Sequence, residues 1–401
     1  MAANVWGQKN FNKQNFAEMY DFNRTKLHPL FQCYHEKDSS STIFYQIDYS
    51  ELTYAMKYDS SYFAQAKIHY EIYYNYKAKD LLDSGSVYLF DQANFNKDNS
   101  SLGSFEVPMS YRNKYLLLLE VTDLNGDYSV KILLDVDKYD KLSRQNFYIR
   151  GEDQLPFLQS YINRNKIFQI ISQKNEYPII NIRYFKPNQS IAKLPMEGIK
   201  KVDRIVKADT ILKIPMKAGY SNILQLEDQG YYHFSFDSTD QSGFTIFQFT
   251  SDYPYVTSPM QMVMPLRYIT SKAEFKALFE SEDKKKAVDD FWIKISGNKE
   301  RAKNMIKLYY NRVQSANQYF VSDKEGWMTD RGMIYIVFGA PDIVYRDGTM
   351  ETWKYGLQQA SKSITFNFYR IENPFTNNDY WIDRSTNYTG PWNNAIEIWR
   401  R

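Results

Sequence analysis

Five carboxylates gather in or just after one stretch of the sequence, residues 325–342, which reads EGWMTDRGMIYIVFGAPD. They are Glu325, Asp330, Asp342, Asp347 and Glu351. Two carboxylates on either side of a scissile bond can act as general acid and as base or nucleophile in hydrolysis. Local turn chemistry explains the same residue types, because Asp after Pro341 is typical of a type I turn. A carboxylate-dependent hydrolase therefore stays open as an alternative.

Other kinds of chemistry lack their residues near this stretch. The four histidines are His28, His35, His69 and His233, so none follows residue 260 to serve as a base or a metal ligand. The phosphate-binding patterns GxxxxGKS/T and GxGxxG do not occur. The single cysteine, Cys33, is expected to be a small buried side chain. We therefore expect no catalytic residue, no metal and no cofactor.

The overall charge and hydropathy limit the partners. The net charge is +3, from 50 basic and 47 acidic residues, which argues against nucleic acid as a partner. No run of 18 apolar residues occurs, so no segment is predicted to span a membrane.

The stretch 325–342 also has a structural interpretation. Gly326 is expected to end a long helix in the left-handed conformation. Trp327 is expected to fold back onto that helix and to add buried apolar area. Thr329 and Asp330 are expected to bond nearby backbone groups and shape the turn. On this interpretation the stretch is a core junction.

A strand is expected directly after this junction. In residues 333–338, MIYIVF, the odd-numbered and the even-numbered residues are both apolar. This is typical of a strand buried on both faces. Gly332 would allow that strand to approach a neighbour closely. Helices can cover only one face, so the second face indicates docking of a neighbouring domain or a partner.

The elements ahead of this junction favour β structure. Aromatic residues make up 17% of the chain, and aromatic side chains favour pleated, half-buried surfaces. In YFAQAKIHYEIYYNYK, apolar and polar residues alternate from residue 62, and Asn125-Gly126 between two apolar runs indicates a hairpin. YYHFSFDSTDQSGFTIFQFT, from residue 231, indicates another hairpin. We predict an N-terminal arm (1–28), a β-sandwich (29–143) and a second β-sandwich-like domain (144–260).

The composition changes near residue 260. Ser271 followed by Glu274 forms a capping box that starts a helix. Apolar residues then recur every three or four positions between 302 and 320, which predicts a long amphipathic helix. The strand-like runs MIYIVF, METWKYG and SITFNFYR follow. Residues 261–401 are therefore predicted to be an α+β domain, with helices packed on a small antiparallel sheet, in a multidomain and mainly β protein.

These residues resemble the GWxTD-domain family, which is named for this motif. The matching residues are Gly326, Trp327, Thr329, Asp330, Arg331, Gly332, Tyr335, Gly339, Pro341, Asp342 and Trp353. The family is found in cell-envelope proteins of Gram-negative bacteria, commonly outer-membrane lipoproteins, and it has no established catalytic residues to transfer. The resemblance implies outer-membrane association through a lipid anchor absent from this chain, or through partners.

Two further functions are expected from these features. The first is a non-enzymatic docking or scaffold protein that binds other envelope proteins in an outer-membrane assembly or secretion complex. The alternative is a surface glycan-binding protein, because β-sandwiches rich in Tyr and Trp can stack sugars on exposed rings. A flat aromatic platform on a sandwich would favour the glycan, whereas an exposed apolar patch would favour docking.

Overall fold

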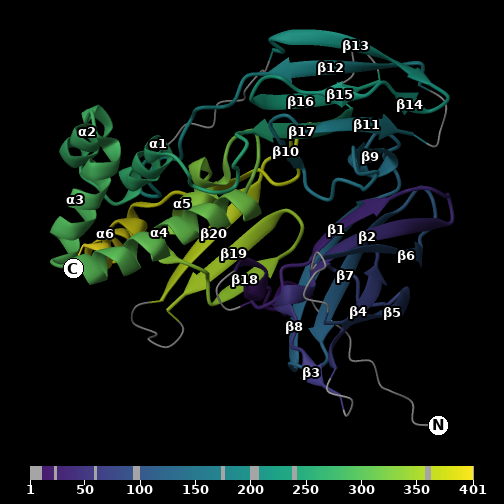
Figure 1. Cartoon of the computed structure of the whole chain (residues 1–401), viewed down its shortest axis with the longest axis horizontal. Helices are drawn as coiled ribbons and strands as arrows, with labels where there is room; N and C mark the ends of the chain where they lie inside the picture. The colour runs from purple at the N-terminus through teal and green to yellow at the C-terminus, as the bar shows by residue number, and fades with distance from the viewer. Residues whose placement is uncertain are drawn as a thin grey trace.

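The computed structural model describes residues 11–21, 25–57, 61–93, 100–172, 177–198, 207–236, 242–356 and 363–400. The protein is multidomain and mainly β, with its helices in the C-terminal part, as the sequence predicts. In Figure 1 the strands β1–β17 lie on one side of the molecule and the helices on the other. No described helix has the length and apolar character needed to cross a membrane.

The first β module, residues 30–137, consists of two antiparallel sheets that share one core. One sheet has the strand order β1-β2-β6, and the other contains β3, β4, β5, β7 and β8. The strands are β1 (Leu30–Tyr34), β2 (Ser40–Asp48), β3 (Ala55–Met56), β4 (Tyr62–Tyr73), β5 (Asp83–Gln92), β6 (Ser100–Pro108), β7 (Lys114–Asp123) and β8 (Tyr128–Asp137).

Three local predictions for this module are confirmed. Ala64, Ala66 and Ile68 in β4 are fully buried and alternate with residues that are less buried. Asn125-Gly126 lies in the turn between β7 and β8, which pair in an antiparallel hairpin. Cys33 is fully buried, as expected for a small apolar side chain.

The second β module, residues 148–249, contains nine paired strands, of which eight follow the order β10-β17-β16-β12-β13-β14-β11-β15 and β9 pairs with β11 off this path. The strands are β9 (Tyr148–Gly151), β10 (Tyr161–Asn163), β11 (Ile167–Ile171), β12 (Ile179–Phe185), β13 (Thr210–Lys217), β14 (Tyr220–Ser221), β15 (Leu224–Gln225), β16 (Gly230–Ser235) and β17 (Gly243–Phe249). β16 and β17 form the predicted hairpin, although its turn at residues 237–241 lies outside the described residues.

The C-terminal module, residues 259–400, packs helices on a four-stranded antiparallel sheet. Its helices are α1 (Pro259–Val263), α2 (Lys272–Glu280), α3 (Lys284–Ser296), α4 (Lys299–Tyr319), α5 (Asp330–Phe338) and α6 (Thr389–Trp399). Its strands are β18 (Ile343–Arg346), β19 (Met350–Tyr355), β20 (Ile364–Arg370) and β21 (Tyr380–Ile382). The predicted capping box of Ser271 and Glu274 starts α2, and α4 is the predicted long amphipathic helix.

The predicted strand at residues 333–338 is wrong, because these residues are the last six of helix α5. Met333, Ile334 and Ile336 are fully buried, so the helix is covered on every side. An apolar run that is buried all round has neither period two nor period 3.6, and the sequence pattern then does not separate strand from helix. The inference that a second strand face needs a partner fails with it.

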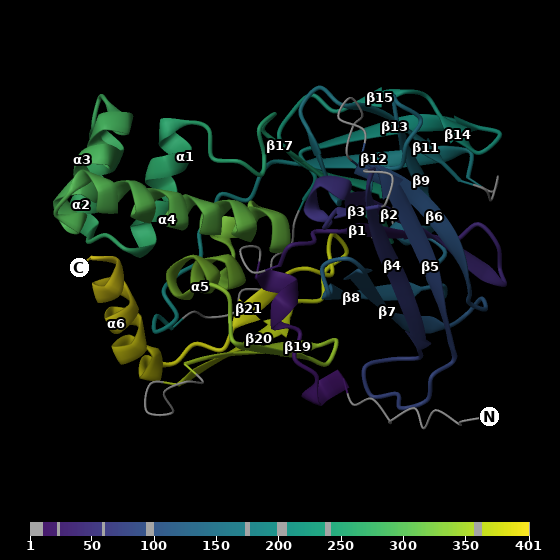
Figure 2. The same cartoon turned by 60° about the horizontal axis from the view of Figure 1, so that its bottom comes forward.

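The first residues of the chain pack against the C-terminal module. The described part of the predicted arm contains the short 3-10 helices η1 (Phe11–Lys13) and η2 (Ala17–Tyr20), while residues 1–10 and 22–24 lie outside the described residues. Phe11, Phe16 and Tyr20 belong to the core of the C-terminal module, and the N–H of Phe16 donates to the carbonyl of Val344 at 2.9 Å. Figure 2 shows this purple segment beside the small sheet. The arm is therefore part of a core at the other end of the sequence.

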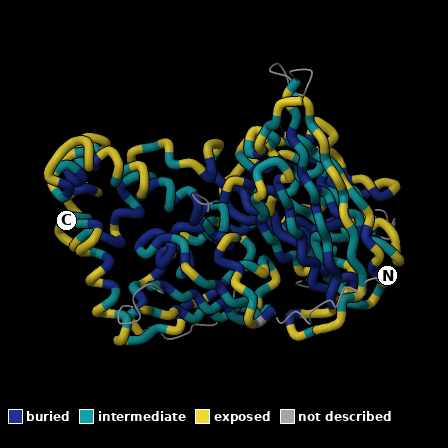
Figure 3. The backbone as a smooth tube through the Cα atoms, turned by 90° about the horizontal axis from the view of Figure 1, so that it is seen from below, coloured by how far each residue is buried: buried dark blue, intermediate teal, exposed yellow. Residues whose placement is uncertain are grey.

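The buried residues concentrate where elements meet. Figure 3 shows them in dark blue within the interior, while the exposed residues follow the outer loops and helix surfaces. The core of the C-terminal module includes all of α5 from Met333 to Val337, together with Trp353 and Phe368 of the sheet. This core positions the motif.

Candidate functional site

Residues 326–338 form a helical corner whose joint is Thr329. The 3-10 helix η6, Gly326–Met328, ends at Thr329, which is the N-cap of α5. The Thr329 hydroxyl accepts a hydrogen bond from the N–H of Gly332 at 3.0 Å and donates to the carbonyl of Gly326 at 2.7 Å. This is the backbone bonding that the sequence predicts for Thr329.

Gly326 and Gly332 bring backbone segments into direct contact. A Cβ atom on Gly326 would lie 1.9 Å from the carbonyl oxygen of Ala316 in α4. A Cβ atom on Gly332 would lie 2.0 Å from the carbonyl oxygen of Gly326. The predicted left-handed Gly326 at the end of the long helix is wrong, since α4 ends at Tyr319 and Gly326 begins η6 without a positive φ. Close approach, and not backbone conformation, requires glycine here.

Trp327 fills the space between η6 and the long helix. Only 4% of the residue is exposed. Its N–H donates to Oδ1 of Asn317 in α4 at 3.1 Å, and its carbonyl accepts from the hydroxyl of Tyr268 at 3.0 Å. Its indole N–H donates to Oε2 of Glu325 at 2.8 Å. Burial raises the pKa of Glu325, and the indole bond opposes this shift by stabilising the charged form.

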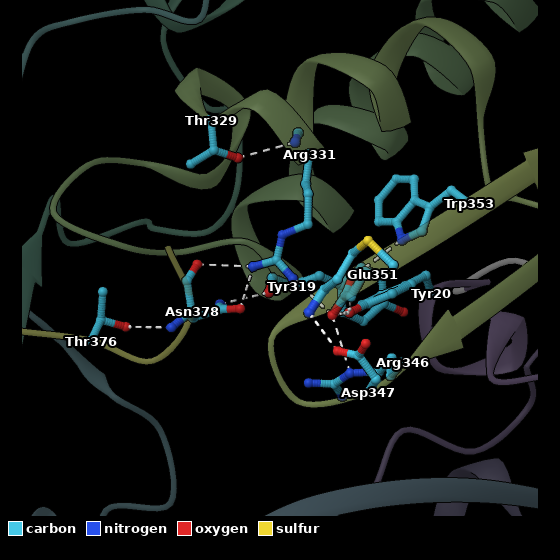
Figure 4. A network of polar contacts seen from close by, with 12 residues as sticks. Tyr20, Tyr319, Thr329, Arg331, Arg346, Asp347, Glu351, Trp353, Thr376 and Asn378 are labelled. Atoms are coloured by element: carbon cyan, nitrogen blue, oxygen red, sulfur yellow. Dashed lines mark hydrogen bonds and ion pairs between the residues drawn. The ribbon is translucent and has the colours of Figure 1, made fainter. Parts of the chain in front are cut away.

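The centre of the site is a buried ion network between α5 and the small sheet (Figure 4). Arg331 is 2% exposed and Glu351 is fully buried. One oxygen of Glu351, Oε1, lies 3.2 Å from Nη1 of Arg331 and 3.1 Å from Nε of Arg346. The hydroxyl of Tyr20 and the indole N–H of Trp353 donate to the same carboxylate at 3.0 and 3.2 Å. The network thus joins the N-terminal segment, α5, β18 and β19.

Arg331 has further contacts that hold its guanidinium in place. Nη2 donates to the carbonyl of Asn378 at 2.8 Å. The guanidinium lies 4.0 Å from the ring centroid of Tyr380 and 5.0 Å from that of Phe320. Cation–π contacts of this kind partly replace the water that burial removes.

The network keeps its charges in spite of burial. Burial works to raise the pKa of Glu351, but Arg331 and Arg346, with the hydrogen bonds from Tyr20 and Trp353, together outweigh it and hold the pKa below its usual value. Burial works to lower the pKa of Arg331, but Glu351, Tyr20 and Tyr380 together outweigh it and the pKa is raised. One carboxylate therefore faces two guanidinium groups, and each side depends on the other to remain buried and charged.

Asp330 makes a second ion pair at the start of α5. Its Oδ1 lies 2.6 Å from Nη2 of Arg384, and both side chains are 11% exposed. Its Oδ2 accepts from the N–H of Ile382 in β21 at 2.9 Å. Arg384 also donates to the carbonyl of Lys193, in the segment that follows β12, at 3.2 Å. Asp330 therefore connects α5 to β21, beyond the local turn expected from the sequence.

The other apolar motif residues complete the core. Tyr335 is 1% exposed and its ring lies edge-on to Phe320, with 5.7 Å between centroids. Gly339 ends α5 with a φ of 88°, and its carbonyl accepts from the hydroxyl of Tyr355 at 3.0 Å. Trp353 is fully buried. Pro341 is buried as well.

The remaining carboxylates have structural partners too. Asp342, which is exposed, accepts from the N–H of Gly356 at 2.8 Å. Asp347 accepts from the N–H groups of Thr349 and Met350 at 2.9 and 2.8 Å, as a turn carboxylate does. Each of the five carboxylates near the motif is thus engaged in bonds that stabilise the fold. Within the described residues, no three His, Cys, Asp or Glu side chains lie where they could hold a metal ion.

The structure adds partners that the sequence reasoning missed. Arg346, Tyr20 and Asn378 all contact the Arg331–Glu351 pair or its carboxylate but were not selected. One signal was available: Glu351 and Trp353 are two residues apart in β19, so they lie on the same face. A Glu beside a core Trp needs a buried cation. The identity of that cation was not readable from local sequence.

The fold and the site define a mainly β, multidomain protein whose C-terminal α+β module has a buried, charge-paired motif at its core. Residues 230–401 match the family model of the GWxTD domain. The C-terminal part of the chain therefore contains a GWxTD domain, as its motif indicates. The matched region begins at β16 and includes the β16–β17 hairpin as well as the whole C-terminal module.

Comparisons with curated proteins and with solved structures give no further relative on which to argue fold or function. No protein with a curated description matches the chain. Among solved structures, the crystal structure of red sea bream transglutaminase is similar over 56% of this chain and 32% of that chain, with 8% identity and a TM-score of 0.19. The chain thus spans about a third of that structure's length, and a TM-score this low supports no argument about fold or function.

Proposed function

We propose that this protein is a non-enzymatic docking or scaffold subunit of an outer-membrane assembly or secretion complex in the Gram-negative cell envelope. The location is the one typical of GWxTD-domain proteins, with outer-membrane association through a lipid anchor or through partners. The motif supports a structural role, because Trp327, Arg331 and Glu351 are buried and bonded within the protein. The engaged carboxylates count against the hydrolase alternative.

The observation that carries the proposal is exposed apolar surface on the β modules, away from the motif. In β13, Ile211 and Leu212 are 56% and 50% exposed. In β5, Tyr88 and Phe90 are 69% and 50% exposed. Clustered exposed apolar side chains are typical of protein-interaction sites, whereas single ones are common on any surface.

In-cell photo-crosslinking of the full-length protein tests the proposal. A photoreactive phenylalanine analogue replaces Leu212 or Tyr88, and a matched control replaces Lys303, an exposed residue of α4. We expect defined crosslinks to other envelope proteins from position 212 or 88 and none from position 303. If neither position gives a crosslink while the protein is folded and located in the envelope, the docking function is refuted.

A second candidate, glycan binding, has one observation in its favour. Tyr88 and Phe90 lie two residues apart in β5, so their rings are on the same sheet face. Phe63 stacks on Phe90 with 5.9 Å between centroids, and Nζ of Lys57 lies 4.7 Å from the Phe90 ring centroid. This is an exposed aromatic platform on the first β module. Binding of envelope polysaccharide that Tyr88→Ala and Phe90→Ala each abolish would support this candidate over docking.

A further inference from the structure

Strand β13 has an edge that no described strand covers. It pairs with β12 from Thr210 to Pro215, and it pairs with β14 only at Met216 and Lys217. Figure 1 shows β13 at the outer margin of its sheet, away from the helices. An uncovered edge offers a row of backbone donors and acceptors to another strand.

The register tells which backbone groups point outward. The N–H of Met216 donates to the carbonyl of Pro178 at 2.9 Å, on the β12 side. Because hydrogen-bonded positions alternate along an antiparallel strand, Ile214 and Leu212 also bond toward β12. Ile211, Lys213 and Pro215 then present their backbone groups to the open side. Pro215 agrees with this assignment, since proline lacks an N–H and belongs at positions that make no ladder bond.

The edge is open because the chain after β14 turns away from β13. Met216 faces Ser221 and Lys217 faces Tyr220, but the following strand β15 pairs with β11 in the facing part of the module. β13 therefore loses its second neighbour before Pro215. The side chain of Leu212 lies on the same face as Ile182, because the two residues are directly paired, and Ile182 is 3% exposed within the core of the module. Leu212 therefore lies on the core face of the sheet, at its uncovered edge.

The two faces of the open edge differ in character. On the core side, Leu212 is 50% exposed. On the other side, Lys213 is exposed beside Ile211, and Lys217 is exposed further along the strand. Asp209 is the acidic residue next to β13. Its Oδ1 lies 3.7 Å from Nζ of Lys186, so its negative charge is already paired. The edge is therefore apolar on the core face, whereas the other face presents Ile211 together with the basic side chains of Lys213 and Lys217.

We propose that the open edge of β13 binds an extended segment of another protein, in which apolar side chains alternate with carboxylates. This inference rests on the proposed docking function and names its surface. A strand added beside β13 would bond the outward N–H groups of Ile211 and Lys213. Its apolar side chains would cover Leu212, and its carboxylates would face Lys213. Cross-strand pairs of opposite charge stabilise such an arrangement.

A second copy of the chain fits this edge less well. In a symmetric antiparallel pair centred on Lys213, two Lys213 ammonium groups would oppose each other, which is destabilising. Pro215 would also face Ile211 and would supply no N–H to the new ladder. Charge complementarity therefore favours an acidic partner over self-association.

Peptide binding to the full chain tests the proposal. The probes are fluorescent nine-residue peptides of alternating valine and glutamate, alternating valine and lysine, and the valine–glutamate peptide with N-methyl groups on the residues that bond β13. Fluorescence anisotropy should show binding of the first peptide at micromolar concentrations and at least about tenfold weaker binding of the other two. Equal binding of the three peptides would mean that neither charge nor strand pairing determines recognition, and would refute the proposal.

Variants assign the binding to β13. Lys213→Glu should reverse the preference between the glutamate and lysine peptides, and Leu212→Asp should abolish binding. Ile398→Asp is the matched control, because Ile398 is 73% exposed on α6, far from β13 in the sequence. Sedimentation that shows a dimer dissociated by Leu212→Asp would refute the proposal in favour of self-association. If no peptide binds while crosslinks still form from position 88, the docking function stands and the assignment of its surface to β13 is refuted.

Discussion

Replacing Glu351 with Gln should strongly destabilise the C-terminal module. The substitution keeps the size of the side chain but removes the one carboxylate that faces Arg331 and Arg346. The buried guanidinium of Arg331 and the largely buried one of Arg346, whose side chain is 14% exposed, then lose the charge of Glu351. Breaking a buried ion pair from one side costs about 3–5 kcal/mol, a large part of the about 5–15 kcal/mol that stabilises an ordinary domain.

Tryptophan fluorescence is the assay for this variant. Six of the seven tryptophans lie after residue 260, so their emission reports mainly on the C-terminal module. A loss of 3–5 kcal/mol should lower the melting temperature of a module of this size by roughly 6–20 °C. Circular dichroism in the far ultraviolet should show that the strands of both β modules persist at the temperature where the fluorescence changes.

Glu106→Gln is the matched control for the same chemical change. Glu106 pairs with Lys37 at 2.8 Å, but the two side chains are 53% and 55% exposed. Exposed ion pairs contribute little, so this variant should melt within about 2 °C of the parent. The triple variant Arg331→Met, Glu351→Leu, Arg346→Met should recover part of the lost stability, because it leaves no unpaired charge. If Glu351→Gln melts like the parent, the network does not stabilise the module as we describe.

Three further predictions concern the same module. Gly326→Ala should cost about 3 kcal/mol, because its Cβ has no space, whereas Gly390→Ala, whose Cβ meets nothing within 4 Å, should leave the fluorescence melt unchanged or slightly raised. Trp327→Ala should cost about 3–5 kcal/mol, and a parent-like melt would show that its ring is not a core residue. Burial, reinforced by Asp323, raises the pKa of Asp379 to about 6, so the stability gained from its neutral form is present near pH 4 and is lost as the pH rises through 6. Asp379→Asn should remove that decline from a series of melts between pH 4 and 7, and an unchanged decline would contradict the assignment.

Local sequence was enough to predict the elements that have one face in solvent. β4 and the β7–β8 hairpin follow from alternation and from Asn125-Gly126, and α2 follows from its capping box. Each signal uses residues only a few positions apart, so no distant partner is needed to interpret it. The motif was recognisable for the same reason, and the burial of Trp327 followed from its position beside a long amphipathic helix.

The tertiary structure decided the elements and partners that local signals do not specify. Residues 333–338 are helical, although their all-apolar sequence has no period, because α5 is enclosed by α4, the small sheet and α6. Tyr20 donates to Glu351 across 331 positions of sequence. A buried carboxylate requires cations and donors, which its own sequence indicates, but which residues supply them depends on how distant segments pack. The sequence by itself thus determined the motif and the kind of core around it, whereas only the packed chain determined which residues hold the charges of that core.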